Sequence, residues 1–102
     1  MAVEITEEFV CQSIPRRARD SHKGTFGSVL AVAGSAFYRG AALLAAEGAL
    51  RTGAGIVTLA SVEPVVSAAV TRLPECCLCP CKEGAQCGIA PENVPLLRRQ
   101  KA

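Results

Sequence analysis

Residues 28–60 read SVLAVAGSAFYRGAALLAAEGALRTGAGIVTLA, and this stretch decides the fold. The apolar run at 28–33, rich in β-branched residues, is typical of a strand covered on both faces of a parallel sheet. Residues 39–52 are mostly alanine and leucine, which favour a helix, and Gly53 supplies a left-handed cap. A second apolar run at 55–60 predicts another buried strand. The stretch therefore predicts strand, helix and strand joined by short turns.

The helix at 39–52 carries few polar residues. Glu47 and Arg51 stand four apart in the favourable acid-then-base order and mark a narrow polar stripe. The many alanines allow close approach to a sheet, so we expect this helix to be mostly buried.

The flanking segments extend the pattern. Thr6, followed by two glutamates, predicts the N-cap of a short helix that ends before Pro15. Residues 64–73 predict a helix with Pro64 in its first turn, and 76–81 a short third strand. This order predicts an α/β fold with a parallel sheet, whose ligands bind beyond the carboxyl ends of the strands. In this chain those places are 34–40 and 61–63.

Composition limits the classes of function. The chain has 102 residues and a mass of 10.6 kDa, enough for one domain. A net charge of +2 and four aromatic residues argue against nucleic acid as a partner. No apolar stretch reaches the roughly 20 residues of a membrane span. The start is acidic and lacks the pattern of a secretion signal, so we expect a cytoplasmic protein that does not enter a membrane.

Five of the six cysteines lie within residues 76–87. With no secretion signal, we expect reduced thiols rather than a disulfide framework. Their spacing lacks the paired C-x-x-C of a structural zinc site. Small apolar packing residues are the simpler interpretation, and adventitious metal binding or oxidation the alternative.

Three glycine-containing segments are candidate sites. In the turn at 34–41, backbone N–H groups and a helix N-terminus would face an anionic ligand, although its glycine spacing is not that of a Walker loop. The alternative is a tight turn without a ligand. Residues 53–55 are better explained as a helix cap and strand entry than as a dinucleotide loop. Residues 22–27 predict a polar turn, or a cationic lip for a phosphorylated ligand. No catalytic base can be named from spacing.

The longer motifs resemble a known family. The run RRARDSHKGTFG at 16–27, the strand VLAVAGS at 29–35, the helix motif GAALLAA at 40–46 and ALRTGAGIVTLA at 49–60 closely resemble the opening of ADP-dependent NAD(P)H-hydrate dehydratases. The resemblance is strong from about residue 6 to 75 and fades afterwards, although PENV at 91–94 still fits the family.

The resemblance implies a ribokinase-like three-layer αβα fold and repair of hydrated NADH or NADPH. The implied chemistry is transfer of a phosphoryl group from ADP (ATP in eukaryotic members) to the C6 hydroxyl of the NAD(P)H hydrate. Phosphate then leaves and the nicotinamide double bond is restored. Mg²⁺ bridges the phosphates in such a transfer. Homo-oligomers are common in the family.

The resemblance also implies site residues. Ala41 corresponds to a substrate contact, and Gly34, Ser35 and Gly40 shape the same wall. The family's catalytic aspartate and nucleotide loop lie in a G-x-G-D segment, and this chain has no Gly-Asp pair. The resemblance therefore supplies no catalytic residue, no metal ligand and no identifiable cofactor-binding residue here.

Family domains are well over twice this length. We therefore expect an amino-terminal fragment, a shifted reading frame or half of a split protein, inactive by itself. It would comprise a lead-in helix and linker at 1–27 and a partial αβα domain at 28–102. The alternatives are a fragment of another ribokinase-like small-molecule kinase and a non-catalytic module that depends on a partner.

Overall fold

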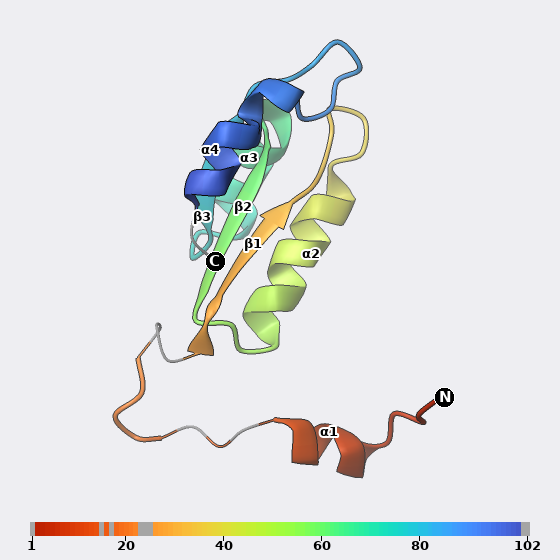
Figure 1. The fold of residues 1–102 in the computed structure, drawn as a ribbon, viewed down its shortest axis with the longest axis vertical. Coiled ribbons are helices and arrows are strands. Elements are labelled where there is room, and N and C mark those ends of the chain that lie inside the picture. Colours follow the sequence, from red (N-terminus) through yellow and green to blue (C-terminus); the bar gives the residue numbers. More distant parts are fainter. Residues whose placement is uncertain (1, 15, 17, 23–25, 101–102) are drawn as a thin grey trace.

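The structure, a computed structural model, describes residues 2–14, 16, 18–22 and 26–100. Figure 1 shows a small sheet with helices beside it and a separate helix near the N-terminus. The elements, in chain order, are α1 (Glu7–Ser13), β1 (Ser28–Val32), α2 (Gly40–Arg51), β2 (Ile56–Val62), α3 (Glu63–Arg72), β3 (Cys77–Cys81), the 3₁₀ helix η2 (Pro91–Asn93) and α4 (Val94–Arg99).

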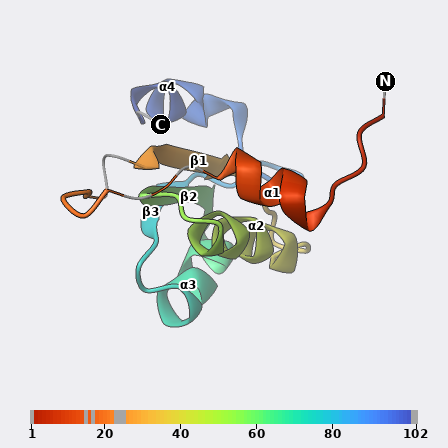
Figure 2. The same cartoon turned by 90° about the horizontal axis from the view of Figure 1, so that it is seen from below.

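The sheet has three parallel strands in the order β1-β2-β3. Ser28 lies opposite Ile56, and Thr58 opposite Cys77. α2 and α3 cover one face, and α4 lies on the other, as Figure 2 shows from below. The predicted α/β fold with a parallel sheet is confirmed, and the helices form the outer layers of an αβα arrangement.

The main core lies between the sheet and the two crossover helices. Val57 and Leu59 of β2 are fully buried against this layer. Ala42 and Ala46 of α2 and Ala69 of α3 have no exposed surface, because their small side chains let both helices approach the sheet closely. The alanine-rich composition thus produces tight helix-on-sheet packing.

The second face has a smaller core, and sequence analysis missed the helix that covers it. Leu96 and Leu97 of α4 pack with Ala60, Cys79 and Cys81. The segment before α4 is held by Asn93, whose side chain accepts a hydrogen bond from the Lys82 amide at 2.9 Å and donates to the Lys82 and Ala90 carbonyls at 2.8 Å each. Six residues with only two leucines are too few for a visible helical period.

Two burial predictions need correction. β1 is covered only in part: Ala31 packs against the main core and Leu30 against the smaller one, but Val29 is 39% and Val32 47% exposed. β1 pairs with β2 alone among the described strands, so it forms an edge of the sheet. α2 is not mostly buried, because it packs on one face only and Leu44 on its outer side is 62% exposed.

The helix α1 begins as predicted. The Thr6 hydroxyl accepts a hydrogen bond from the Phe9 amide at 3.1 Å, and no residue of α1 is buried. Pro15 and residues 23–25 of the predicted polar turn lie outside the described residues. Within the described ranges, no helix is long and apolar enough to cross a bilayer.

Candidate functional site

Three loops meet at the carboxyl edge of the sheet, at the upper end of Figure 1. They are the β1–α2 loop at 33–39, the β2–α3 junction at Val62 and Glu63, and the loop at 82–90 after β3. The two predicted ligand-binding places, 34–40 and 61–63, lie at this edge. In a parallel α/β sheet this is the edge where ligands bind.

Gly34 is the most tightly enclosed residue of the site. Its φ of +97° is a conformation that side-chain-bearing residues rarely adopt. A Cβ atom there would lie 2.7 Å from the Ser61 Oγ and 3.1 Å from both the Ala42 Cβ and the Val65 Cγ2. Ser61 is fully buried and donates a hydrogen bond to the Ala33 carbonyl at 2.5 Å, which joins the ends of β1 and β2. Gly34 is therefore enclosed by protein atoms, and it fixes the shape of the turn rather than facing a ligand.

The turn itself is closed by Ser35. The Ser35 amide donates to the Tyr38 carbonyl at 3.2 Å, and the Ser35 hydroxyl accepts from the Tyr38 amide at 3.1 Å. The Ala36 amide donates to the Cys87 carbonyl at 2.9 Å. The prediction that the N–H groups of this turn face a ligand is wrong for Ser35, Ala36 and Tyr38, because these amides already bond to the protein.

The open part of the turn is its far end. Gly40 and Ala41 are exposed, and no atom lies within 4 Å of a Cβ placed on Gly40. The side chain of Arg39 is held by a 2.7 Å hydrogen bond from its Nε to the Ala36 carbonyl. α2 begins here without a side-chain cap, so the Arg39 side chain accepts no hydrogen bond from its first amides. A ligand can approach the backbone at Gly40 and Ala41, whereas Gly34 is enclosed by protein atoms.

Sequence analysis missed the loop at 82–90 as a neighbour of the turn. Glu83 and Ile89 form an antiparallel bridge, and the Gly84 amide donates to the Gly88 carbonyl at 2.8 Å. Cys87 has a φ of 63°. A hollow of about 490 Å³ is lined by residues of this loop: Gly84, Ala85, Gln86, Gly88, Ile89, Ala90 and Pro91. The closely spaced glycines were the signal for a tight loop here.

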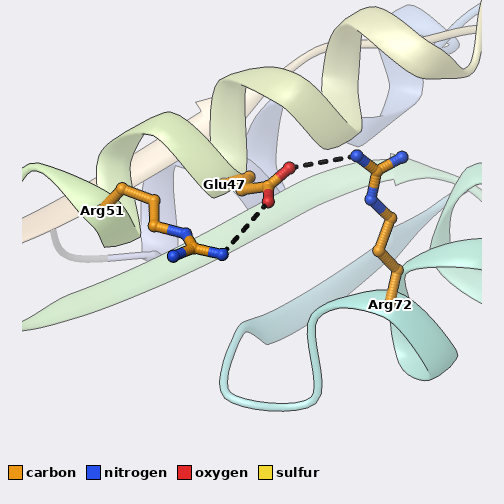
Figure 3. Close-up of polar contacts among 3 residues, drawn as sticks. All are labelled: Glu47, Arg51 and Arg72. Carbon is orange, nitrogen blue, oxygen red and sulfur yellow. Dashed lines mark hydrogen bonds and ion pairs between the residues drawn. The ribbon is translucent and has the colours of Figure 1, made fainter.

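A second hollow, of about 310 Å³, lies where α2 and α3 end. Figure 3 shows that Glu47 points between Arg51 and Arg72 there. The Glu47 carboxylate lies 3.1 Å from the Arg72 guanidinium and 3.7 Å from that of Arg51. The predicted Glu47–Arg51 pair is confirmed, and Arg72 extends it into a contact between the helices. With Glu75 the hollow has two acidic and two basic side chains whose formal charges cancel, so it is a weaker ligand site than the turn.

Three of the four cysteines in and next to β3 are packing residues. Cys76, Cys79 and Cys81 are buried, and Cys77 is exposed. Burial raises the pKa of the Cys76 and Cys81 thiols above the ordinary value, which keeps them neutral. Within the described residues, no three Cys, His, Asp or Glu side chains gather as metal ligands would. The described residues therefore offer no such cluster to which the Mg²⁺ that the resemblance implies can be assigned.

Known proteins resemble the chain across this edge. A family model described as NAD(P)H-hydrate dehydratase matches residues 29–99. The ADP-dependent (S)-NAD(P)H-hydrate dehydratase of Listeria monocytogenes is 45% identical over 73 residues, which are 72% of this chain and 26% of that protein. Its counterpart in Bacillus subtilis is 47% identical over 70 residues, 69% of this chain and 25% of that protein.

Solved structures agree. An ADP/ATP-dependent NAD(P)H-hydrate dehydratase from Bacillus subtilis, co-crystallised with ATP and Mg²⁺, matches with a TM-score of 0.67 and 45% identity over 72% of this chain and 26% of that chain. A ribokinase-like superfamily protein from Enterococcus faecalis matches with a TM-score of 0.63 and 30% identity over 66% of this chain and 24% of that chain. The fold is therefore ribokinase-like.

The family match corrects the extent of the resemblance. It begins at Val29 and continues to Arg99, well past the residues where the motifs fade, and therefore includes the loop at 82–90 and α4. The chain spans about a quarter of the length of the curated relatives that it matches. With more than half of its residues matched, this chain belongs to the NAD(P)H-hydrate dehydratase family.

Proposed function

We propose that this chain carries part of the substrate wall of an enzyme that dehydrates NADH or NADPH hydrate with ADP as phosphoryl donor. The observation that carries the proposal is that the family match runs through all three loops at the carboxyl edge. The relatives are named as dehydratases that act on NAD(P)H hydrate and depend on ADP.

Gly40 and Ala41 are the residues that we assign to substrate contact. Both are exposed at the start of α2, and their lack of bulk lets a dinucleotide come close to the backbone. Gly34 and Ser35 support the turn without contacting the substrate, because Gly34 packs against Ser61 and Ser35 closes the turn. Gly40 and Ala41 therefore contact the substrate, Gly34 and Ser35 position the turn, and none of the four transfers a proton.

The phosphoryl transfer itself is not assigned to residues of this chain. The described carboxylates do not gather at the carboxyl edge, and Glu63, which lies there, accepts a hydrogen bond from the Ser67 hydroxyl at 2.7 Å. We therefore propose that the 102-residue chain is inactive alone. Mixed with NADH hydrate, ADP and Mg²⁺, it should produce no rise in the absorbance of the reduced nicotinamide. A steady rise that depends on the chain would contradict this.

Binding tests the substrate assignment separately from catalysis. Equilibrium dialysis of the chain against NADPH hydrate should show binding that Ala41→Trp abolishes, because an indole would fill the open space at the start of α2. Val70→Trp is the matched control, since Val70 is exposed on α3, outside the turn. Equal binding by both variants, or none by the unaltered chain, would overturn the assignment.

A second candidate function is a module that folds or works with a partner chain. The observation that favours it is the edge strand β1, which exposes two valines and pairs on one side only. Such an edge is a template for pairing with another chain, including a second copy. Sedimentation at micromolar concentration should then show association. A monodisperse monomer that unfolds cooperatively would count against this candidate.

A further inference from the structure

Two neighbouring aromatic side chains stand in solvent at the tip of the β1–α2 turn. Phe37 is 76% and Tyr38 78% exposed. Among the described aromatic side chains these two are the most exposed, although aromatic rings usually dominate the buried surface of a protein. Because they lie at the edge of the sheet where ligands bind, these exposed rings favour a ligand with an apolar surface.

Tyr38 is held in place by its own backbone. Its amide and carbonyl both bond to Ser35, at 3.1 Å and 3.2 Å. The turn is fixed in addition by the bond from the Ala36 amide to Cys87. A ring on an anchored backbone loses little conformational freedom when it binds a ligand, which favours affinity.

The surroundings of Tyr38 match the chemistry of a nucleotide. Arg39 follows it directly, with its guanidinium tied through Nε to the Ala36 carbonyl, and provides a positive charge for phosphate. The exposed Gly40 and Ala41 have little bulk to obstruct a flat base. The Ala36 amide joins the turn to Cys87, and the residues on either side of Cys87, Gln86 and Gly88, line the hollow of about 490 Å³, which is within the size range of small-molecule pockets.

We propose that Tyr38 stacks on the adenine base of a nucleotide bound at this turn; the inference rests on the proposed function. The adenine is the flat aromatic ring of NAD(P)H hydrate, because reduction and addition of water leave saturated carbons in the nicotinamide ring. Aromatic side chains bind bases through such stacking. The same chemistry could come from the dinucleotide or from ADP, and the experiment separates these sources.

Tyr38 is the one tyrosine of the sequence, which has no tryptophan, so tyrosine emission reports on this position alone. The probes are NADPH hydrate, ADP and the hydrate of reduced nicotinamide mononucleotide, which lacks adenine. Free N-acetyltyrosinamide corrects for light absorbed by the probes. We expect NADPH hydrate to quench the emission at saturation and the mononucleotide hydrate to leave it unchanged.

Variants give the second readout, with affinity measured by calorimetry. Tyr38→Phe keeps the ring and should bind NADPH hydrate within about twofold of the unaltered chain, whereas Tyr38→Leu should bind about tenfold more weakly. Phe9→Leu is the control, because Phe9 is a partly exposed aromatic residue of α1, outside the turn. All three variants should keep the melting temperature, since neither ring is buried.

The outcomes separate this inference from the proposed function. If NADPH hydrate binds but neither the emission nor the Tyr38→Leu affinity changes, stacking is overturned and the substrate assignment stands. Equal quenching by the mononucleotide hydrate also overturns stacking on adenine. Quenching by ADP alone supports the stacking and assigns the adenine to ADP. If none of the three probes binds, both proposals fail.

Discussion

At the scale of single residues, the candidate site depends on how Gly34 and Ser61 fit together. Gly34 combines a positive φ with contacts that leave no room for a methyl group. Ser61 fills that room from β2 and bonds to the carbonyl just before Gly34. The conformation of the turn that carries Ser35, Tyr38 and Gly40 therefore depends on one glycine and one buried hydroxyl.

Gly34→Ala should destabilise the chain by about 2–4 kcal/mol. Overpacking typically costs about 1–3 kcal/mol, and the left-handed backbone about 1 kcal/mol more. Urea unfolding measures the loss. Gly48→Ala is the matched control, because no atom lies within 4 Å of its added Cβ, and it should stabilise by about 0.5–1 kcal/mol in the middle of α2.

The clash also predicts an energetic coupling between two residues. Ser61→Ala alone should cost about 1 kcal/mol, for the lost hydrogen bond to Ala33. It also removes the atom nearest to the new methyl group, so Gly34→Ala should be less damaging in the Ser61→Ala background. A double-mutant cycle with strictly additive losses would show that the contact with Ser61 is not what excludes a side chain at residue 34.

At the scale of secondary-structure elements, the sequence predicts the segments between residues 28 and 81 well, because strands and helices there have clear apolar runs. α4 was missed because a six-residue helix that contains a proline has no measurable period, and the loop at 82–90 was missed because a loop has no period at all. The exposure of β1 and α2 could not be predicted either: an apolar run indicates a strand, but does not show how many neighbours cover it. At the site, the sequence motifs located the turn, but only the structure showed which of its amides already donate hydrogen bonds to the protein.

The contact of α2 with α3 through Glu47 should be weak and sensitive to salt. Arg72 lies closer to Glu47 than Arg51 does and is less exposed. Arg72→Gln should therefore lower the stability by up to about 1 kcal/mol and Arg51→Gln by less. Thermal unfolding at low and high salt measures both, and about 1 M salt should erase the difference. A larger loss for Arg51→Gln would contradict the geometry.

The buried thiols of Cys76 and Cys81 lead us to expect that the stability of the fold depends on pH. The pKa of Cys76 and of Cys81 is raised in the folded chain, mainly by burial, so the folded state holds these protons more tightly than the unfolded state. Their stabilising contribution is complete below the ordinary pKa of 9.0 and is lost as the pH rises above it.

Urea midpoints measured between neutral and alkaline pH test this. The decline at high pH should be shallower in a Cys76→Ala, Cys81→Ala double variant. Cys11→Ala is the control, because Cys11 is an exposed cysteine of α1, and it should leave the slope unchanged. The same slope in all three proteins would mean that thiol burial does not contribute.

At the scale of the whole molecule, the described elements form a three-stranded sheet with β2 in the middle and β1 and β3 at its edges. The described chain extends 46 × 35 × 27 Å, with α1 apart from the sheet in Figure 1. The matched relatives are about four times as long as the segment that they share with this chain. The contribution to such an enzyme that we propose for this segment is the turn after β1, joined to the loop after β3.

The most direct test of that contribution is amide chemical-shift mapping by NMR, with the 102-residue chain titrated with NADPH hydrate. The shifts should concentrate at residues 34–41 and 83–90, and the hollow lined by Glu47, Arg51 and Arg72 should stay unchanged. Shifts centred on those three charged residues, or none at saturating ligand, would contradict a substrate wall at the carboxyl edge of the sheet.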